Sequence, residues 1–204
     1  MVDSSTSSRI TRRDKEHFLH QHARSIWMTG LSGAGKTTLG LALEKKLFHL
    51  GFFIQLLDGD HVRTGLNKDL RFSDADRTEN IRRIAEVNAL YNHSGIITIN
   101  CFISPTHAIR QMARATIGSA DFIEVFIKAP LSVCEERDVK GYYRKARQGL
   151  IKEFTGVDSP FEEPEHPDLL IDTSFSSVDQ CLHKMIGFIL PKITITPVSQ
   201  RVSQ

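Results

Sequence analysis

Cysteine is scarce in this chain. The three cysteines, Cys101, Cys134 and Cys181, are odd in number, form no Cys-x-x-Cys pair and each lie in an apolar stretch. A disulfide framework or a thiolate zinc site needs paired or closely spaced cysteines, so the pattern excludes both. We therefore expect reduced cysteines in the core of a cytoplasmic protein.

Long apolar runs are also missing. The longest, such as residues 185–190, are far too short to cross a bilayer. The start of the chain is rich in Ser and Thr but has no apolar stretch of the kind found in a secretory signal. Arginines at positions 9, 12 and 13 are typical of a transit peptide, but the acids at positions 3, 14 and 16 are not. We expect a soluble protein with no membrane partner.

Neither sign of charge dominates. Lys and Arg number 26 against 24 Asp and Glu, which gives a formal net charge of +2. Such a balance gives no reason to expect a nucleic-acid partner. With 40% apolar and 25% charged residues, the composition is that of an ordinary globular protein, and the length suits one domain with a substantial core.

Short β-branched runs alternate with longer stretches of helical period. Strands are expected at residues 25–29, 52–57, 96–102, 122–128 and 169–171, and helices at 37–50, 77–91, 106–117, 131–137 and 178–190. Such alternation predicts a five-stranded parallel sheet with helices on both faces.

The alternation divides the chain into a domain with two flanking segments. We expect an N-terminal extension with a short helix at 1–24, the domain at 25–192 and a flexible tail at 193–204. Inside the domain, residues 138–167 are charged and contain glycines and prolines without a clear period. Long irregular segments in compact domains usually serve a function, so this one is predicted to be a lid.

The strongest motif is Gly30-Leu31-Ser32-Gly33-Ala34-Gly35-Lys36-Thr37, a complete GxxxxGK[ST] between an expected strand and an expected helix. The glycines let backbone N–H groups surround phosphates, and the helix that follows adds its positive end. Lys36 is predicted to reach the β- and γ-phosphates of ATP, and Thr37 to bind Mg²⁺. With Thr38, these residues form the predicted nucleotide site of a P-loop kinase-type three-layer sandwich.

A P-loop alone does not identify the reaction. The guanine-reading NKxD motif of GTPases has only a distant counterpart, Asn67-Lys68-Asp69-Leu70, whose last residue is wrong and which lies too early in the chain. The small size and the predicted lid favour a small-molecule kinase. An ATP-binding regulatory or scaffold domain is the alternative outside enzymes, although intact Lys36 and Thr37 argue against it.

Two further groups of polar residues are candidates for the site. Asp58-Gly59-Asp60 ends the second expected strand, where carboxylates can orient Mg²⁺ waters or accept a hydroxyl proton; the same sequence is also typical of a solvated turn. Arg77 and Asn80 share one face of a helix that Ser73 can cap. Such a pair can bind a phosphate or sulfate together with the edge of a base or ribose. The alternative is that both residues belong to an ordinary charged helix surface.

Several strings together resemble adenylylsulfate kinase. They are the GLSGAGKT loop, Asp58-Gly59-Asp60, GLNKDL at 65–70, the segment from Phe72 to Arg83, Phe102-Ile103-Ser104-Pro105, RDVKG at 137–141, KAR at 145–147, FTG at 154–156 and SPFEEP at 159–164. The resemblance runs from about residue 10 to about residue 190, and several strings are peculiar to that family in spacing and identity.

The resemblance implies a reaction: transfer of phosphate from MgATP to the ribose 3′-hydroxyl of adenosine 5′-phosphosulfate (APS), giving 3′-phosphoadenosine 5′-phosphosulfate (PAPS). It implies that Phe72 and Phe161 sandwich the adenine of APS and that Arg63 and Arg77 hold its phosphosulfate. The other residues implied at the substrate site are Asp58, Asp60, Asn80, Ile103, Ser104, Lys140, Lys145 and Phe154, and Arg137 is implied at the nucleotide.

Catalytic roles are implied for Lys36, Asp60 and Ser104. The family's serine is often assigned as a phosphorylated intermediate, but P-loop kinases need only positioning and charge neutralisation, so we expect direct transfer. The chain departs from the family at Tyr142, Arg144 and Glu153, where Leu, Lys and Gly are usual. The partners we expect are APS, a second copy of the chain in a homodimer, and the ATP sulfurylase that makes APS.

Overall fold

Five parallel strands form the centre of the fold in the order β2-β3-β1-β4-β5. The computed structural model describes residues 9–195. The strands are β1 (Ser25–Thr29), β2 (Ile54–Asp58), β3 (Ile97–Cys101), β4 (Phe122–Lys128) and β5 (Leu169–Asp172). The predicted five-stranded parallel sheet is confirmed, and the strand bounds differ from the expected ones by at most two residues.

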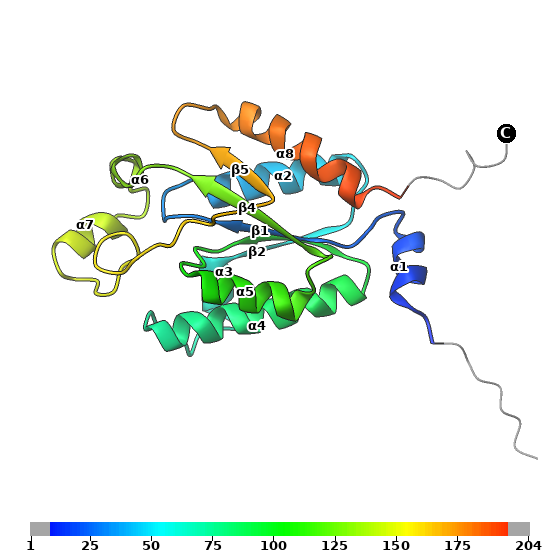
Figure 1. The fold of residues 1–204 in the computed structure, drawn as a ribbon, viewed down its shortest axis with the longest axis horizontal. Coiled ribbons are helices and arrows are strands. Elements are labelled where there is room, and N and C mark those ends of the chain that lie inside the picture. The colour runs from blue at the N-terminus through cyan, green and yellow to red at the C-terminus, as the bar shows by residue number, and fades with distance from the viewer. Residues whose placement is uncertain (1–8, 196–204) are drawn as a thin grey trace, which may run out of the picture.

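Helices cover both faces of the sheet, which makes the predicted three-layer sandwich (Figure 1). On one face lie α2 (Lys36–His49) and α8 (Val178–Ile193), and on the other α4 (Asp74–His93) and α5 (His107–Ile117). The central strands β1 and β3 are therefore buried at every position, which explains why most of their residues are apolar or β-branched and none is charged. Each face has its own hydrophobic cluster.

Four short helices lie outside these layers. They are α1 (Arg12–Phe18), α3 (Gly59–Thr64), α6 (Leu131–Arg137) and α7 (Tyr142–Arg147). Of these, α3 and α7 are not predicted from the sequence; α7 lies inside the segment 138–167 that the sequence presents as irregular. Figure 1 shows α6 and α7 beyond the carboxyl ends of the strands.

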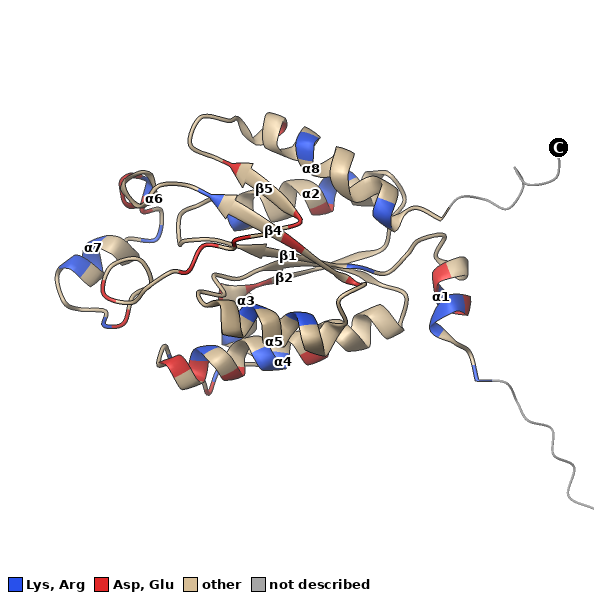
Figure 2. Cartoon of the chain, viewed as in Figure 1, with Lys and Arg blue, Asp and Glu red and all other residues tan. Residues whose placement is uncertain are grey.

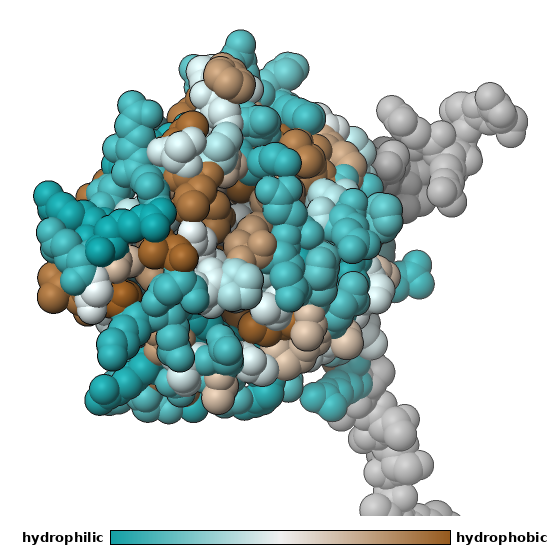
Figure 3. All heavy atoms as spheres, turned by 60° about the vertical axis from the view of Figure 1, so that its left-hand side comes forward, coloured by the Kyte–Doolittle hydropathy of each residue, from teal (hydrophilic) through white to brown (hydrophobic). Residues whose placement is uncertain are grey.

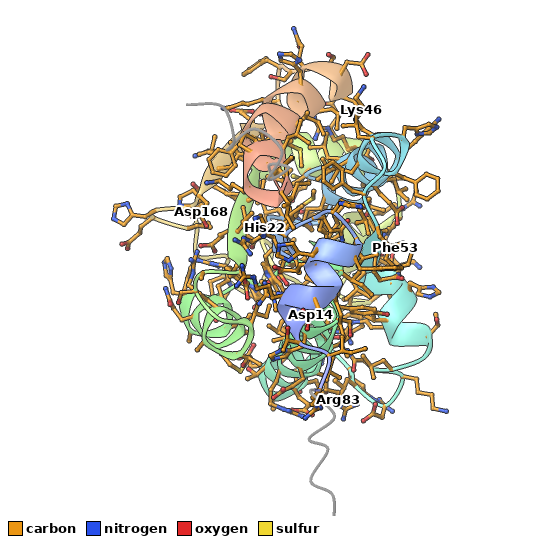
Figure 4. The ribbon with its side chains drawn as sticks, turned by 90° about the vertical axis from the view of Figure 1, so that its right-hand side faces the viewer. Asp14, His22, Lys46, Phe53, Arg83 and Asp168 are labelled. Atoms are coloured by element: carbon orange, nitrogen blue, oxygen red, sulfur yellow. The ribbon has the colours of Figure 1, made fainter. Side chains whose placement is uncertain are left out.

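The opposite end of the sheet is covered by α1. Figure 4 shows this helix, with Asp14 labelled, lying across the amino ends of the strands. Arg12 pairs with Asp121, and the amide of Gln21 donates to the carbonyl of Phe53 at 2.9 Å. Gln21 also forms a bridge with Thr194, which follows the end of α8, and the remainder of the predicted tail from residue 196 lies outside the described residues.

A buried polar cluster fixes α4 against the sheet. Asn88 on α4 accepts from the hydroxyl of Ser25 at 3.0 Å, pairs with Thr98 and donates to the amide oxygen of Asn100 at 2.8 Å. These four side chains are fully buried. Because unpaired buried polar groups are costly, only one register of α4 satisfies the cluster. The cluster therefore sets where the start of α4 lies at the carboxyl edge.

The three cysteines are free and buried, as expected. Burial raises the pKa of the Cys101 thiol to about 12, so this group stays neutral. Among the described helices, none combines the length and the hydropathy that crossing a membrane requires.

Candidate active site

The glycine loop leaves β1 in a tight turn against β4. Gly30 has a φ of 147°, and a Cβ at this position would lie 2.3 Å from the carbonyl oxygen of Ile127. Gly33 has a φ of 75° and would place a Cβ 2.9 Å from the carbonyl oxygen of Cys134. Only glycine fits these two positions, because both conformation and space exclude a side chain.

Three side chains bind the loop's carbonyl groups from outside. The hydroxyl of Tyr143 donates to the Ser32 carbonyl at 2.9 Å, and that of Thr173 donates to the Ala34 carbonyl at 2.8 Å. Arg137 donates to the Gly33 carbonyl at 3.3 Å. The N–H groups of Gly30 and Ala34 donate to the carbonyls of Ile103 and Leu31, so the other N–H groups of the loop and the start of α2 remain for an anion.

Lys36 is the first residue of α2 and is 8% exposed. Its ammonium donates to the carbonyls of Gly30 at 2.8 Å and Leu31 at 2.7 Å, so it lies within the loop. Burial disfavours the charged form and lowers the pKa of Lys36 to about 8. A polyphosphate in the loop would favour the charged form and raise this pKa again.

Thr37 and Asp58 form the predicted metal-binding side. The Thr37 hydroxyl donates to Oδ2 of Asp58 at 2.7 Å, and Oδ1 of Asp58 accepts the N–H of Asp60 at 3.0 Å at the start of α3. Hydroxyl and carboxylate oxygens suit Mg²⁺, which usually takes one or two protein ligands together with phosphate oxygens and waters. Within residues 9–195 no cluster of three His, Cys, Asp or Glu side chains could hold a metal by itself.

Asp60 faces the lid rather than the glycine loop. Its carboxylate pairs with the ammonium of Lys140, and both side chains are about half exposed. Burial of Lys140 opposes its charge, but the hydrogen bond to Asp60 and the negative charges of Asp60 and Asp58 together outweigh burial and raise the Lys140 pKa. Figure 2 shows further basic residues on α7 in the same lid. The predicted Lys145 is exposed there, as is Thr38 on α2.

Arg63 and Phe72 meet on the second side of the site. The Arg63 guanidinium carbon lies 4.6 Å from the centre of the Phe72 ring, and this ring is 54% exposed. Nη1 of Arg63 donates to the Arg71 carbonyl at 2.9 Å. Burial and the nearby charge of Arg77 lower the pKa of Arg63, which makes this corner favourable for an anion.

Arg77 holds the lid. Its Nε donates to the Phe72 carbonyl at 2.8 Å, and its two Nη atoms donate to the Thr155 hydroxyl and the Glu153 carbonyl. Arg77 is 8% exposed, so its guanidinium is enclosed by these groups. Asn80, one turn later, accepts from the amide of Asn67 at 2.9 Å and is 5% exposed. The predicted shared face of Arg77 and Asn80 is thus turned toward the protein.

The predicted aromatic residues have separate partners. Phe161 stacks on Phe126 of β4 with ring centres 6.0 Å apart, whereas Phe72 lies under Arg63. Phe154 packs edge-on against Tyr143 at 5.0 Å. Phe154 thereby joins the start of the lid to its return segment.

Ile103 and Ser104 follow β3 and lie beside the glycine loop. The Gly30 N–H donates to the Ile103 carbonyl at 3.4 Å. Ser104 is 2% exposed, and its Oγ accepts from the indole N–H of Trp27 at 3.0 Å. A hydroxyl enclosed in this way is poorly placed to attack a phosphate.

Two cavities open at this edge. One of about 560 Å³ is lined by Thr37, Asp58, Asp60 and His61, among others. The other, of about 310 Å³, lies between the starts of α4 and α5 and the lid residues Ser159 and Pro160. Figure 3 turns the side with the lid forward and shows hydrophobic side chains in the middle of this face between hydrophilic ones. Such a mixed surface is typical of small-molecule sites.

Sequence reasoning missed Tyr143, Thr155 and Thr173. Thr173 follows β5 directly, so the rule that ligand sites lie beyond the carboxyl ends of parallel strands indicates it. Thr155 belongs to FTG at 154–156, one of the strings that resemble adenylylsulfate kinase. Tyr143 contacts a residue 111 positions away, and no local pattern points to that contact.

These parts, a glycine loop opening a helix, a buried lysine, a hydroxyl paired with a carboxylate and a basic lid, are those of a P-loop kinase. The chain belongs to the adenylylsulphate kinase family, whose model matches residues 22–172. It is 54% identical over 184 residues to the adenylyl-sulfate kinase of Bacteroides thetaiotaomicron, covering 90% of this chain and 92% of that protein. The adenylyl-sulfate kinase of Clostridium acetobutylicum is 50% identical and covers 89% of this chain and 90% of its own length.

Solved structures agree with this membership. The Mycobacterium tuberculosis APS kinase CysC, in complex with AMPPNP and APS, has a TM-score of 0.80 and 43% identity, covering 83% of this chain and 98% of that one. A gluconokinase from Sinorhizobium meliloti, 18% identical with a TM-score of 0.59, covers 84% of this chain and 94% of its own. At that identity the gluconokinase shares the fold alone.

The lowered pKa of Lys36 predicts proton uptake when nucleotide binds. At pH 8 the ammonium is about half charged in the free protein, and bound phosphates stabilise the charged form, so about 0.5 proton is taken up per MgATP. Calorimetry at pH 8 in buffers of different ionisation enthalpy measures this uptake. Lys36→Met should bind without it, and equal uptake in the two proteins would show that another group titrates.

Proposed function

We propose that this protein transfers the γ-phosphate of MgATP to the 3′-hydroxyl of APS and releases ADP and PAPS. The observation that carries the proposal is the Arg63–Phe72 pair, whose guanidinium carbon lies 4.6 Å from the ring centre, in a chain of this family. A guanidinium suits the phosphosulfate, and a half-exposed ring suits the adenine. We assign these two residues to the acceptor.

The donor site in this proposal is the glycine loop. Its N–H groups and Lys36 hold the β- and γ-phosphates, and Arg137 and Thr173 support the loop from outside. Thr37 and Asp58 would hold Mg²⁺, which neutralises phosphate charge when bound. Lys36 must leave the loop carbonyls to reach a γ-phosphate.

Asp60 is the residue we assign to the acceptor's hydroxyl. In the structure its carboxylate is paired with Lys140, an ion pair that is exposed and therefore weak. Substrate can displace Lys140, after which Lys140 is free for phosphate oxygens and Asp60 for the 3′-hydroxyl proton. We propose direct transfer, because the enclosed Ser104 hydroxyl accepts from Trp27.

Arg63, rather than Arg77, is the stronger candidate for the phosphosulfate. Within residues 9–195, Nε and Nη2 of Arg63 have no hydrogen-bond partner, whereas all three nitrogens of Arg77 donate to the chain. Arg77 then acts on the acceptor through the lid. Asn80, Ile103, Lys145, Phe154 and Phe161 remain proposed contacts of APS.

The remaining expectations are part of the same proposal. Three free, buried cysteines suit a reducing compartment, and we propose a cytoplasmic enzyme of sulfate activation. We also propose a homodimer and an ATP sulfurylase that supplies APS. Light scattering of the purified protein measures its oligomeric state directly and so tests the homodimer.

The acceptor is tested by measuring ADP release with a panel of acceptors. We expect rapid release with APS and MgATP, and a product carrying a new phosphate on the 3′-oxygen. Lys36→Ala should lose about 10²–10³-fold in kcat, since a preorganised charge is removed from the transition state. Faster turnover with gluconate or shikimate than with APS would contradict the proposal.

Arg63→Ala should raise the KM for APS by about 10- to 150-fold, the equivalent of about 1.5–3 kcal/mol for a hydrogen bond to a charged group. The KM for ATP should stay unchanged, and Arg63→Lys should recover only part of the loss, because an ammonium cannot form the paired fork. Arg82→Ala removes an exposed arginine from the outside of α4 and is the matched control. An unchanged KM for APS in Arg63→Ala would remove Arg63 from the acceptor site.

A further inference from the structure

Ser104 has a backbone conformation that is unfavourable for its residue type. Its φ is 47°, in the left-handed region that residues with a Cβ seldom occupy. It lies at the carboxyl edge, in the turn of residues 103–105 that follows β3. Such a conformation persists only where the surroundings hold it.

Three side chains hold this turn. Arg110 of α5 donates from Nη1 to the Ser104 carbonyl at 2.8 Å. Trp27 of β1 donates to the Ser104 Oγ at 3.0 Å, and the Thr29 hydroxyl donates to the Ile103 carbonyl at 2.5 Å. Of the three side chains, only that of Arg110 is charged, and it is buried, with 3% of its surface exposed.

A chain of charges fixes Arg110 in place. Its Nε lies 3.0 Å from Oε1 of Glu124 on β4, and its Nη2 lies 3.0 Å from Nδ1 of His107. Glu124 lies in turn 3.5 Å from Arg114, which pairs with Asp168 at 3.2 Å. The guanidinium of Arg110 is therefore held from the side opposite Ser104.

A buried ion pair of this kind is poorly explained by stability. Taking both charges out of water costs about as much as their attraction returns, and apolar residues of similar volume often serve a core equally well. What an apolar residue cannot do is donate to a carbonyl. The distinctive effect of Arg110 is thus its hydrogen bond to Ser104.

The turn that Arg110 holds joins the donor and acceptor sides. On one side the Ile103 carbonyl accepts the N–H of Gly30, the first residue of the glycine loop. On the other side the Pro105 carbonyl accepts the N–H of Glu162 at 2.8 Å, next to Phe161 in the returning lid. A shift of the turn would move the glycine loop and the lid relative to each other.

We propose that Arg110 is a positioning residue for phosphoryl transfer, acting through the Ser104 carbonyl on the turn that aligns donor and acceptor. The proposal rests on the proposed function. Arg110 touches neither substrate, so its loss should lower kcat and leave both KM values near those of the wild type. Misplacement of reacting groups by about 1 Å can cost on the order of 10²-fold in rate, which is the size of effect expected.

The test compares Arg110→Lys with Arg114→Lys. Both changes keep the charge beside Glu124 on the same helix, but only Arg110 contacts Ser104. A lysine at position 110 cannot reach the carboxylate and the carbonyl together in the same way. Arg110→Lys should lower kcat with APS, whereas Arg114→Lys should not.

Fluorescence gives a second readout that does not depend on activity. Trp27 is the single tryptophan and donates to Ser104, so its emission reports the turn. Arg110→Lys should shift this emission, and Arg114→Lys should leave it unchanged. If Arg110→Lys fails to fold, Arg110→Gln combined with Glu124→Gln replaces the ion pair by neutral amides and takes its place in both measurements.

A lowered kcat together with a shifted Trp27 emission, both confined to the position 110 variants, supports the proposal. A position 110 variant that matches Arg114→Lys in either readout overturns it, as does an equal loss in Arg114→Lys. The wild type is assayed first with APS. Its failure to release ADP would reject the proposed function, and the emission of Trp27 would still decide whether Arg110 holds the turn.

Discussion

The close approach of Gly30 to the Ile127 carbonyl is the constraint on which the rest of the site depends. A Cβ at Gly30 would lie 2.3 Å from that oxygen, so only glycine lets the loop leave β1 along this path against β4. This path brings the loop's carbonyls within reach of Tyr143 from the lid and of Thr173 from the end of β5. Both residues lie more than 100 positions from the loop residues that they contact, so this one loop joins segments that are distant from it in the sequence.

The lid is attached to the domain in two different ways. Near its start, the Lys140–Asp60 pair is exposed, and such pairs are weak and sensitive to salt. Near its return, the buried Arg77 guanidinium holds the Glu153 carbonyl and the Thr155 hydroxyl. Glu153 also has a φ of 57°, which a side chain disfavours, so this anchor holds a strained segment. The physical expectation is a lid that opens first at the Lys140 end.

Much of the fold could be predicted because its signals are local. The alternation of β-branched runs with helical period predicts the parallel sheet, and the expected helix at 37–50 after the glycine motif agrees to within one residue with α2, which begins at Lys36. The short helices α3 and α7 have six residues each, too few to show a helical period. The partners of Arg77 could not be predicted, because Thr155 lies 78 positions further on and no pattern encodes the contact. Sequence patterns therefore predict which residues belong to the candidate site more readily than they predict the hydrogen-bond partners of those residues.

In the proposed function, the protein positions two nucleotides so that a phosphoryl group passes directly between them. In this proposal, the glycine loop, Lys36 and Thr37 hold the donor and the Arg63–Phe72 pair holds the acceptor, while the Ser104 hydroxyl stays enclosed beside Trp27. The most direct test is the stereochemical course at phosphorus, measured with ATP made chiral at the γ-phosphate by oxygen isotopes and with APS as acceptor. Direct in-line transfer predicts inversion of configuration in PAPS. Retention, the result of two successive displacements through a phosphorylated residue, would contradict direct transfer.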